Sequence, residues 1–125
     1  MARINPPSDD QQPVASVPLL DAVATQLGVV PNLMKLVSHS PAALEGYLAL
    51  NGALARGVLG SGLRERIAIA VAEENGCNYC LSAHAWLAAN VARVDAAEID
   101  AARDATSADT RVGAALHFAR RVVRA

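Results

Sequence analysis

The 125-residue sequence contains few aromatic residues and only two cysteines. Phenylalanine, tyrosine and tryptophan together make up 3% of the chain, whereas hydrophobic residues as a whole make up 53%. The apolar content therefore lies mostly in small side chains, of which 27 are alanine. Alanine is the strongest helix former and allows helices to pack closely. A small domain with so few large apolar side chains is expected to complete its core by association with further copies.

An excess of charge of either sign is also absent, because 11 basic residues face 12 acidic ones and the net charge is −1. A nucleic-acid interface would need a basic stripe, so the composition argues against this class of partner. No apolar run approaches the roughly 18 residues of a membrane span, and residues 1–18 are too polar for a signal core. We therefore expect a cytoplasmic protein without a membrane partner. Two cysteines in a reducing compartment favour a reactive or metal-binding role over a permanent disulfide.

Strand-like alternation of apolar and polar residues is missing as well, which predicts an all-α fold. Residues 1–17 hold three of the six prolines and no helical period, so we expect a loose N-terminal arm before a single helical domain over residues 18–125. The apolar stretch IAIAVA at 67–72 is interpreted as part of a buried helix. Proline and glycine breaks divide the domain into about six to seven helices. They are expected near residues 18–27, 31–40, 41–56, 63–75 and 77–90, from a capping box at Asp95–Glu98, and at 107–125.

Both cysteines lie in ENGCNYCLSAH, residues 74–84. The first of them directly follows Gly76, which is expected to end the preceding helix. Cys77 and Cys80 are three residues apart and share a helix face, and His84 follows four residues later on the same stripe. The N–H groups and the dipole of a helix start lower a thiol pKa below its free value of roughly 8.5. A thiolate beside a second thiol can attack an oxidant and be resolved as a disulfide, while His84 relays a proton. Helix position alone makes Cys77 the more acidic thiol.

Other interpretations of this motif stay open on the residues alone. The two cysteines can be small apolar core residues. A zinc site with C-x2-C-x3-H spacing is a second alternative, although structural zinc takes four ligands and the other histidines, His39 and His117, lie far along the chain. A third is a non-catalytic subunit that retains the motif.

Outside the motif, Glu65 is the strongest candidate for chemistry. On a helix it shares its face with small apolar residues, and a carboxylate on such a face indicates proton transfer rather than solvation. His39, in a turn before a Ser-Pro pair, is a possible pocket residue. We expect Glu73 and Glu74 to cap and solvate a helix end. Packing in the core or an interface is expected for Tyr47, Trp86 and Phe118.

The segment LRERIAIAVAEENGCNYCLSAH, residues 63–84, resembles the core motif of the alkyl hydroperoxidase AhpD-like proteins. These belong to the carboxymuconolactone decarboxylase superfamily, and the similarity is to its peroxidase-related branch. The motif places a glutamate twelve residues before the first cysteine and a histidine four residues after the second. Glu65, Cys77, Cys80 and His84 occupy these positions. Weaker similarity extends over roughly residues 18–105.

The resemblance implies an AhpD-like helical bundle that reduces hydroperoxides as an antioxidant enzyme, with no metal, haem or flavin. It assigns peroxide attack to Cys80, closure of the disulfide to Cys77, and a proton relay to Glu65 and His84. Helix position favoured Cys77 instead; we follow the resemblance, because His84 lies one turn from Cys80 and two turns from Cys77. An external dithiol, lipoyl-type or thioredoxin-like, would reopen the disulfide. The dimers, trimers and hexamers of the family make a homo-oligomer the expected assembly.

The sequence departs from the family pattern at Tyr79, where well-studied members carry a histidine between the cysteines. A phenol with a pKa near 10 relays protons poorly at neutral pH, although it still donates a hydrogen bond. The helical pattern still runs at Ala125, so we also expect either a short form of the family or one that lacks a helix pair. The alternative functions are a C-x-x-C redox sensor or interaction protein with slow turnover or none, and carboxymuconolactone decarboxylase activity, which the cysteine pair disfavours.

Overall fold

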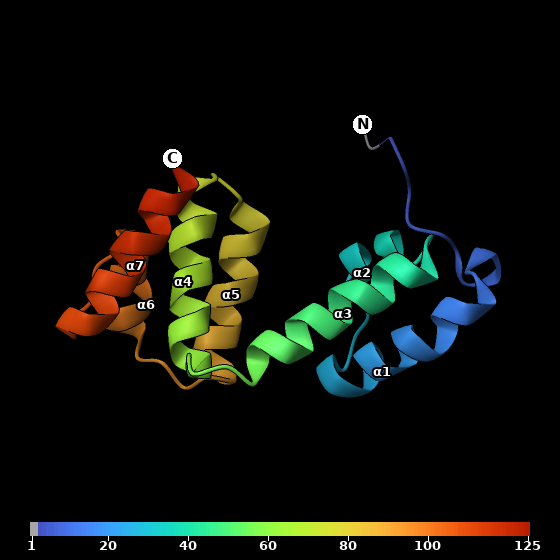
Figure 1. Cartoon of the computed structure of the whole chain (residues 1–125), viewed down its shortest axis with the longest axis horizontal. Helices are drawn as coiled ribbons and strands as arrows, with labels where there is room; N and C mark the ends of the chain where they lie inside the picture. The colour runs from blue at the N-terminus through green and yellow to red at the C-terminus, as the bar shows by residue number, and fades with distance from the viewer. Residues whose placement is uncertain (1–2) are drawn as a thin grey trace. The chain divides into compact units, whose positions relative to one another are not determined.

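The computed structural model describes residues 3–125, and the regular structure of this range is helical throughout (Figure 1). This confirms the predicted all-α fold and the expected number of helices. Two short 3-10 helices, η1 (Asp9–Gln11) and η2 (Val14–Ser16), come first. The α-helices that follow are α1 Val17–Leu27, α2 Asn32–Val37, α3 Pro41–Ala55, α4 Ser61–Glu74, α5 Asn78–Asn90, α6 Ala96–Arg103 and α7 Thr110–Val123. Among the same residues, no helix is both long and apolar enough to cross a membrane.

Two compact units divide the chain, one ending at Arg56 and the other beginning at Gly57. The division falls where α3 has ended and α4 has not yet begun, at the glycine-rich break predicted for residues 57–62. The expectation of one domain over residues 18–125 stays a prediction.

In the first unit, η2 contacts α1 and α3, and α2 contacts α3. Ser16, the last residue of η2, is fully buried, and its hydroxyl donates to the carbonyl of Ser38 at 2.7 Å. The segment expected as a loose arm thus contains two 3-10 helices and a buried anchor. Ser40 caps α3 as predicted, because its side chain accepts the N–H of Ala43. The buried apolar side chains of this unit are Leu20, Val23 and Leu44.

In the second unit, α4 is the central helix and contacts α5, α6 and α7, while α5 also contacts α6 (Figure 1). Its buried cluster consists mostly of alanines, and small side chains allow the helices to approach closely. The stretch 67–72 lies within α4, and its Ile69, Ala70 and Ala72 are buried, which confirms the buried-helix prediction. The cluster is made of Ile69, Ala70, Ala88, Ala102, Ala105 and Leu116.

The capping box predicted at Asp95–Glu98 does not form, and this prediction was wrong. Asp95 is the N-cap residue of α6, but its side chain makes no capping hydrogen bond. The Glu98 carboxylate instead accepts a hydrogen bond of 2.7 Å from the guanidinium of Arg66 on α4. It also accepts hydrogen bonds from the Ser107 hydroxyl at 2.5 Å and from the Ala108 N–H at 2.9 Å. Several charge-assisted bonds that join three segments outweigh the one bond to a solvent-exposed backbone N–H that a capping box offers.

The aromatic side chains do not enter the core of either unit, and packing in an interface, the other expectation for them, stays a prediction. Tyr47 is 38% exposed, Trp86 60% and Phe118 70%. In the second unit, the space between the helices is filled by four alanines, Ile69 and Leu116, with further aliphatic side chains packed against them. On α7, Leu116 points into the cluster, and Phe118, two residues further, therefore points to another side.

Candidate redox site

The turn between α4 and α5 places the cysteine pair. Gly76 has a φ of +62°, which favours glycine because a side chain there is strained. Its N–H donates to the carbonyl of Glu73 at 3.0 Å, and the N–H of Cys77 donates to the carbonyl of Ala72 at 2.9 Å. This pair of bonds is a Schellman motif, which satisfies carbonyls at the end of α4. The predicted stop at Gly76 is therefore confirmed, and Cys77 is held at the entrance of α5.

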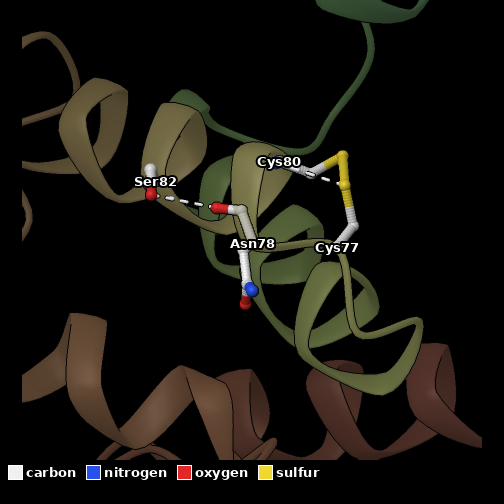
Figure 2. Close-up of a disulfide and its surroundings, with 4 residues drawn as sticks. All are labelled: Cys77, Asn78, Cys80 and Ser82. Carbon is white, nitrogen blue, oxygen red and sulfur yellow. Dashed lines mark hydrogen bonds between the residues drawn. A yellow bond between two sulfur atoms is a disulfide. The ribbon is translucent and has the colours of Figure 1, made fainter. Parts of the chain in front are cut away.

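Cys77 and Cys80 are joined in a disulfide at the start of α5, and both residues are half-buried. Cys77 is the N-cap residue of α5, and its Sγ accepts the N–H of Cys80 at 3.3 Å, where a serine or aspartate oxygen would usually act. Figure 2 shows the two bonded sulfurs and, along the next turn, the Ser82 hydroxyl donating to the Asn78 carbonyl. A negative charge on the Cys77 sulfur would be stabilised by this N–H and by the helix dipole.

Glu65 and His84 form the second part of the site. Their side chains come from α4 and α5, and His84 Nδ1 lies 2.8 Å from Glu65 Oε2. Both are partly sheltered from water, with 37% of the histidine side chain and 22% of the glutamate side chain exposed. An ionised carboxylate only accepts hydrogen bonds, so it selects the tautomer in which Nδ1 carries the proton. The lone pair of Nε2 is then available to take a proton from a substrate or a thiol.

Helix geometry relates His84 to the cysteines. His84 follows Cys80 by four residues within α5, so the two side chains stand on adjacent turns with roughly 5–6 Å between their Cβ atoms. Cys77 lies a further turn away, outside the first turn of the helix. The described geometry therefore places His84 nearer Cys80, whereas the capping hydrogen bond favours charge on Cys77.

The accessory candidates are Tyr79 and His39. Tyr79 is 71% exposed and, one residue before Cys80, points about 100° away from it around the helix. His39 belongs to the first unit, where its Nε2 is 2.9 Å from the carbonyl oxygen of Asn5. His117 is exposed on α7. As for zinc, residues 3–125 contain no group of three or more His, Cys, Asp or Glu side chains arranged to hold a metal ion.

Two ion pairs beside the turn were missed from the sequence. Glu73 and Glu74 end α4, and instead of only facing solvent they reach other helices. Glu73 lies 2.8 Å from Arg103 of α6, and Glu74 binds Arg124 through both carboxylate oxygens. The hydrogen bond from Arg124 lowers the pKa of Glu74. The paired residues are 30 and 50 positions apart in the sequence. No local pattern predicts such pairs, since any of the chain's arginines could have filled either role.

Comparison with known proteins supplies a family context for this geometry. A family model described as the carboxymuconolactone decarboxylase family matches residues 41–125, more than half of the chain. The matched range contains Glu65, Cys77, Cys80 and His84. No curated protein matches the sequence.

Proposed function

The chain belongs to the carboxymuconolactone decarboxylase family, and from this premise we propose that it reduces hydroperoxides through the Cys77–Cys80 pair. The observation that carries the proposal is the 2.8 Å hydrogen bond between Glu65 and His84, one helical turn from a cysteine pair that is already joined as a disulfide. A nucleophile, a resolving thiol and an oriented base are the three groups that this chemistry needs.

In the first step, the thiolate of Cys80 attacks the outer oxygen of the hydroperoxide. The O–O bond breaks, the sulfur becomes a sulfenic acid, and the alkoxide leaves as an alcohol after taking a proton. His84 is the group positioned to remove the proton from Cys80 and pass it to the alkoxide. Glu65 keeps the ring oriented and stabilises the imidazolium that forms in between.

In the second step, the thiolate of Cys77 attacks the sulfenic sulfur of Cys80. The new S–S bond forms and the hydroxyl group leaves as water after taking a proton. Cys77 suits this role because its sulfur caps α5 and accepts the N–H of Cys80, which favours the thiolate. The two arguments about the cysteines thus describe two roles: the base lies nearer the attacking thiol, and the helix end stabilises the resolving one.

An external dithiol completes the cycle by reducing the disulfide and becoming a disulfide itself. Thiol–disulfide exchange proceeds through a mixed disulfide, and the better leaving group is the sulfur with the lower pKa. Cys77 fits this leaving role for the same reason that it fits the resolving role. We propose a lipoyl-type or thioredoxin-like donor.

The test follows consumption of a small alkyl hydroperoxide with excess dithiothreitol, comparing the wild type with Cys80→Ser and Cys77→Ser. Sustained turnover that Cys80→Ser abolishes is the expected result. Consumption of a single equivalent would contradict turnover and indicate a redox sensor. No consumption, or turnover indifferent to both substitutions, would overturn the proposal and direct attention to decarboxylase chemistry.

A further inference from the structure

The outward side of α5 differs from the other exposed helix surfaces of the second unit. Tyr79 and Trp86 are seven residues apart, two helical turns, so they lie on one side of the helix, and Asn90 extends the same side. Tyr79 is 71% exposed and Trp86 60% exposed. The opposite side carries Leu81 and the fully buried Ala88, which pack in the core of the unit. We refer to Tyr79, Trp86 and Asn90 as the aromatic face of α5.

This face carries no charge. From Asn78 to Asn90, α5 contains no Asp, Glu, Lys or Arg, although α4 and α6, which contact it, each contain charged residues of both signs. A helix surface that only meets water is normally covered with charged residues. Exposed tyrosine and tryptophan without neighbouring charge are instead typical of the centre of a protein interface, where charged residues are depleted.

The position of the face relates it to the disulfide. Cys80 directly follows Tyr79, so its sulfur lies at the border between the aromatic face and the packed side of α5. Reduction requires an incoming thiol to reach a sulfur of the pair, and a protein that carries this thiol must rest on the surface next to it. The aromatic face begins at Tyr79, the residue before Cys80, and is an exposed surface next to the disulfide that offers large side chains for such a contact.

We propose that the aromatic face of α5 is the docking surface for the protein dithiol that reopens the Cys77–Cys80 disulfide, which rests on the proposed function. The absence of charge on α5 selects a donor whose surface around its own thiols is apolar and uncharged, because a charged surface would lose its hydration against this face without gaining an ion pair. Trp86 is the anchor of this contact, and Tyr79 extends it to the disulfide.

The exchange reaction that follows docking is balanced in electrons and protons. A donor thiolate attacks Sγ of Cys80, a donor–Cys80 bond forms, and the Cys77–Cys80 bond breaks with its electron pair on Cys77. The second donor thiolate then attacks the first donor sulfur and releases Cys80 as a thiolate. The donor leaves as a disulfide, and the released thiolates take up protons as their pKa values dictate.

The experiment compares two reductants on the oxidised protein. Reduced thioredoxin is the protein dithiol, dithiothreitol is the small one, and the second-order rate constant for opening the Cys77–Cys80 disulfide is measured with each. The variants are Trp86→Ala, Trp86→Tyr and the matched control Phe118→Ala, which removes a similarly exposed aromatic ring from α7. We expect Trp86→Ala to lower the thioredoxin rate constant about tenfold, as loss of an interface anchor does, and to leave the dithiothreitol rate constant unchanged. Trp86→Tyr and Phe118→Ala should retain both.

Several results would overturn the docking proposal. They are an equal loss with both reductants, an equal loss in Trp86→Ala and Phe118→Ala, or a wild-type disulfide that thioredoxin opens no faster than dithiothreitol does. Sedimentation of the same variants tests whether the face binds a second copy of the chain. If Trp86→Ala dissociates an oligomer without altering the ratio of the two rate constants, the face is such a contact between copies and the docking proposal is wrong. Peroxide turnover supported by dithiothreitol is measured in parallel. Its absence would refute the proposed function, while the ratio of reduction rates would still decide the docking surface.

Discussion

His84 Nδ1 on α5 lies 2.8 Å from Glu65 Oε2 on α4, across 19 residues of sequence. The two helices are joined by a turn that reverses the chain at Gly76, so the same turn that brings the cysteines to the start of α5 also lays α5 against α4. The alignment of the imidazole and the carboxylate therefore depends on the turn as well as on the residues themselves.

Replacing Glu65 by glutamine should lower kcat/KM for a small alkyl hydroperoxide, with excess dithiothreitol as reductant, by roughly ten- to hundredfold. The amide keeps the shape of the side chain but has no charge to orient the histidine tautomer or to stabilise the imidazolium. Glu45→Gln on the exposed surface of α3 is the matched control and should be as active as the wild type. Wild-type activity in Glu65→Gln would remove Glu65 from the mechanism.

Gly76→Ala should destabilise the fold by about 1–2 kcal/mol, the cost of an L-residue in the left-handed region. No atom lies within 4 Å of the position that a Cβ would take, so the cost is conformational rather than steric. Gly46→Ala is the matched control, because Gly46 lies inside α3 with equally open space around it. Alanine there should stabilise the protein by roughly 0.5–1 kcal/mol. Urea unfolding measures both variants, and effects of the same sign would contradict the role of the turn.

The Glu98 carboxylate should make stability depend on acid pH. The Ser107 hydroxyl, the Ala108 N–H and then the Arg66 guanidinium hold the pKa of Glu98 below its ordinary value of 4.5. A depressed folded-state pKa contributes stability that is present above 4.5 and is lost as the pH falls through the folded value. Glu98→Gln should therefore be less stable than the wild type at neutral pH and lose less stability on acidification.

Ser107→Ala checks the cause of this shift. Removal of the hydroxyl, the strongest of the three influences, should move the pKa of Glu98 back toward its ordinary value. NMR titration of the Glu98 carboxyl carbon measures the shift directly, and thermal unfolding at several pH values measures its effect on stability. An unchanged carboxyl pKa in this variant would assign the shift to the other partners.

Two neighbouring positions on α7 test the alanine-rich core. Leu116 is fully buried in the cluster of the second unit, whereas Phe118 is 70% exposed. Leu116→Ala should cost about 2–5 kcal/mol, because it removes buried apolar atoms and leaves a cavity in the cluster. Phe118→Ala should change the free energy of unfolding by no more than about 0.5 kcal/mol. Comparable losses at both positions would mean that Phe118 is buried in an assembly.

Much of the site could be predicted from the sequence because its signals are local. The glycine stop, the C-x-x-C spacing and the histidine four residues later lie within eleven residues, and helical geometry converts such spacings into shared faces. Glu65 was predicted by a similar local argument, a carboxylate on an apolar helix face. The helices themselves followed from alanine content and from proline and glycine breaks.

Contacts between distant segments were beyond such reasoning. Glu98 was expected to cap its own helix, since Asp95 stands three residues before it, but Arg66, 32 residues earlier, binds it instead. The ion pairs of Glu73 and Glu74, and the exposure of every aromatic ring, were decided in the same way by which helices meet and how closely. Local signals set where the helices begin and end and how the cysteines and His84 are spaced, because propensity and capping act within a few residues. Which charges pair and which rings remain in solvent could be learned from the folded structure alone, because those outcomes depend on which distant helices meet.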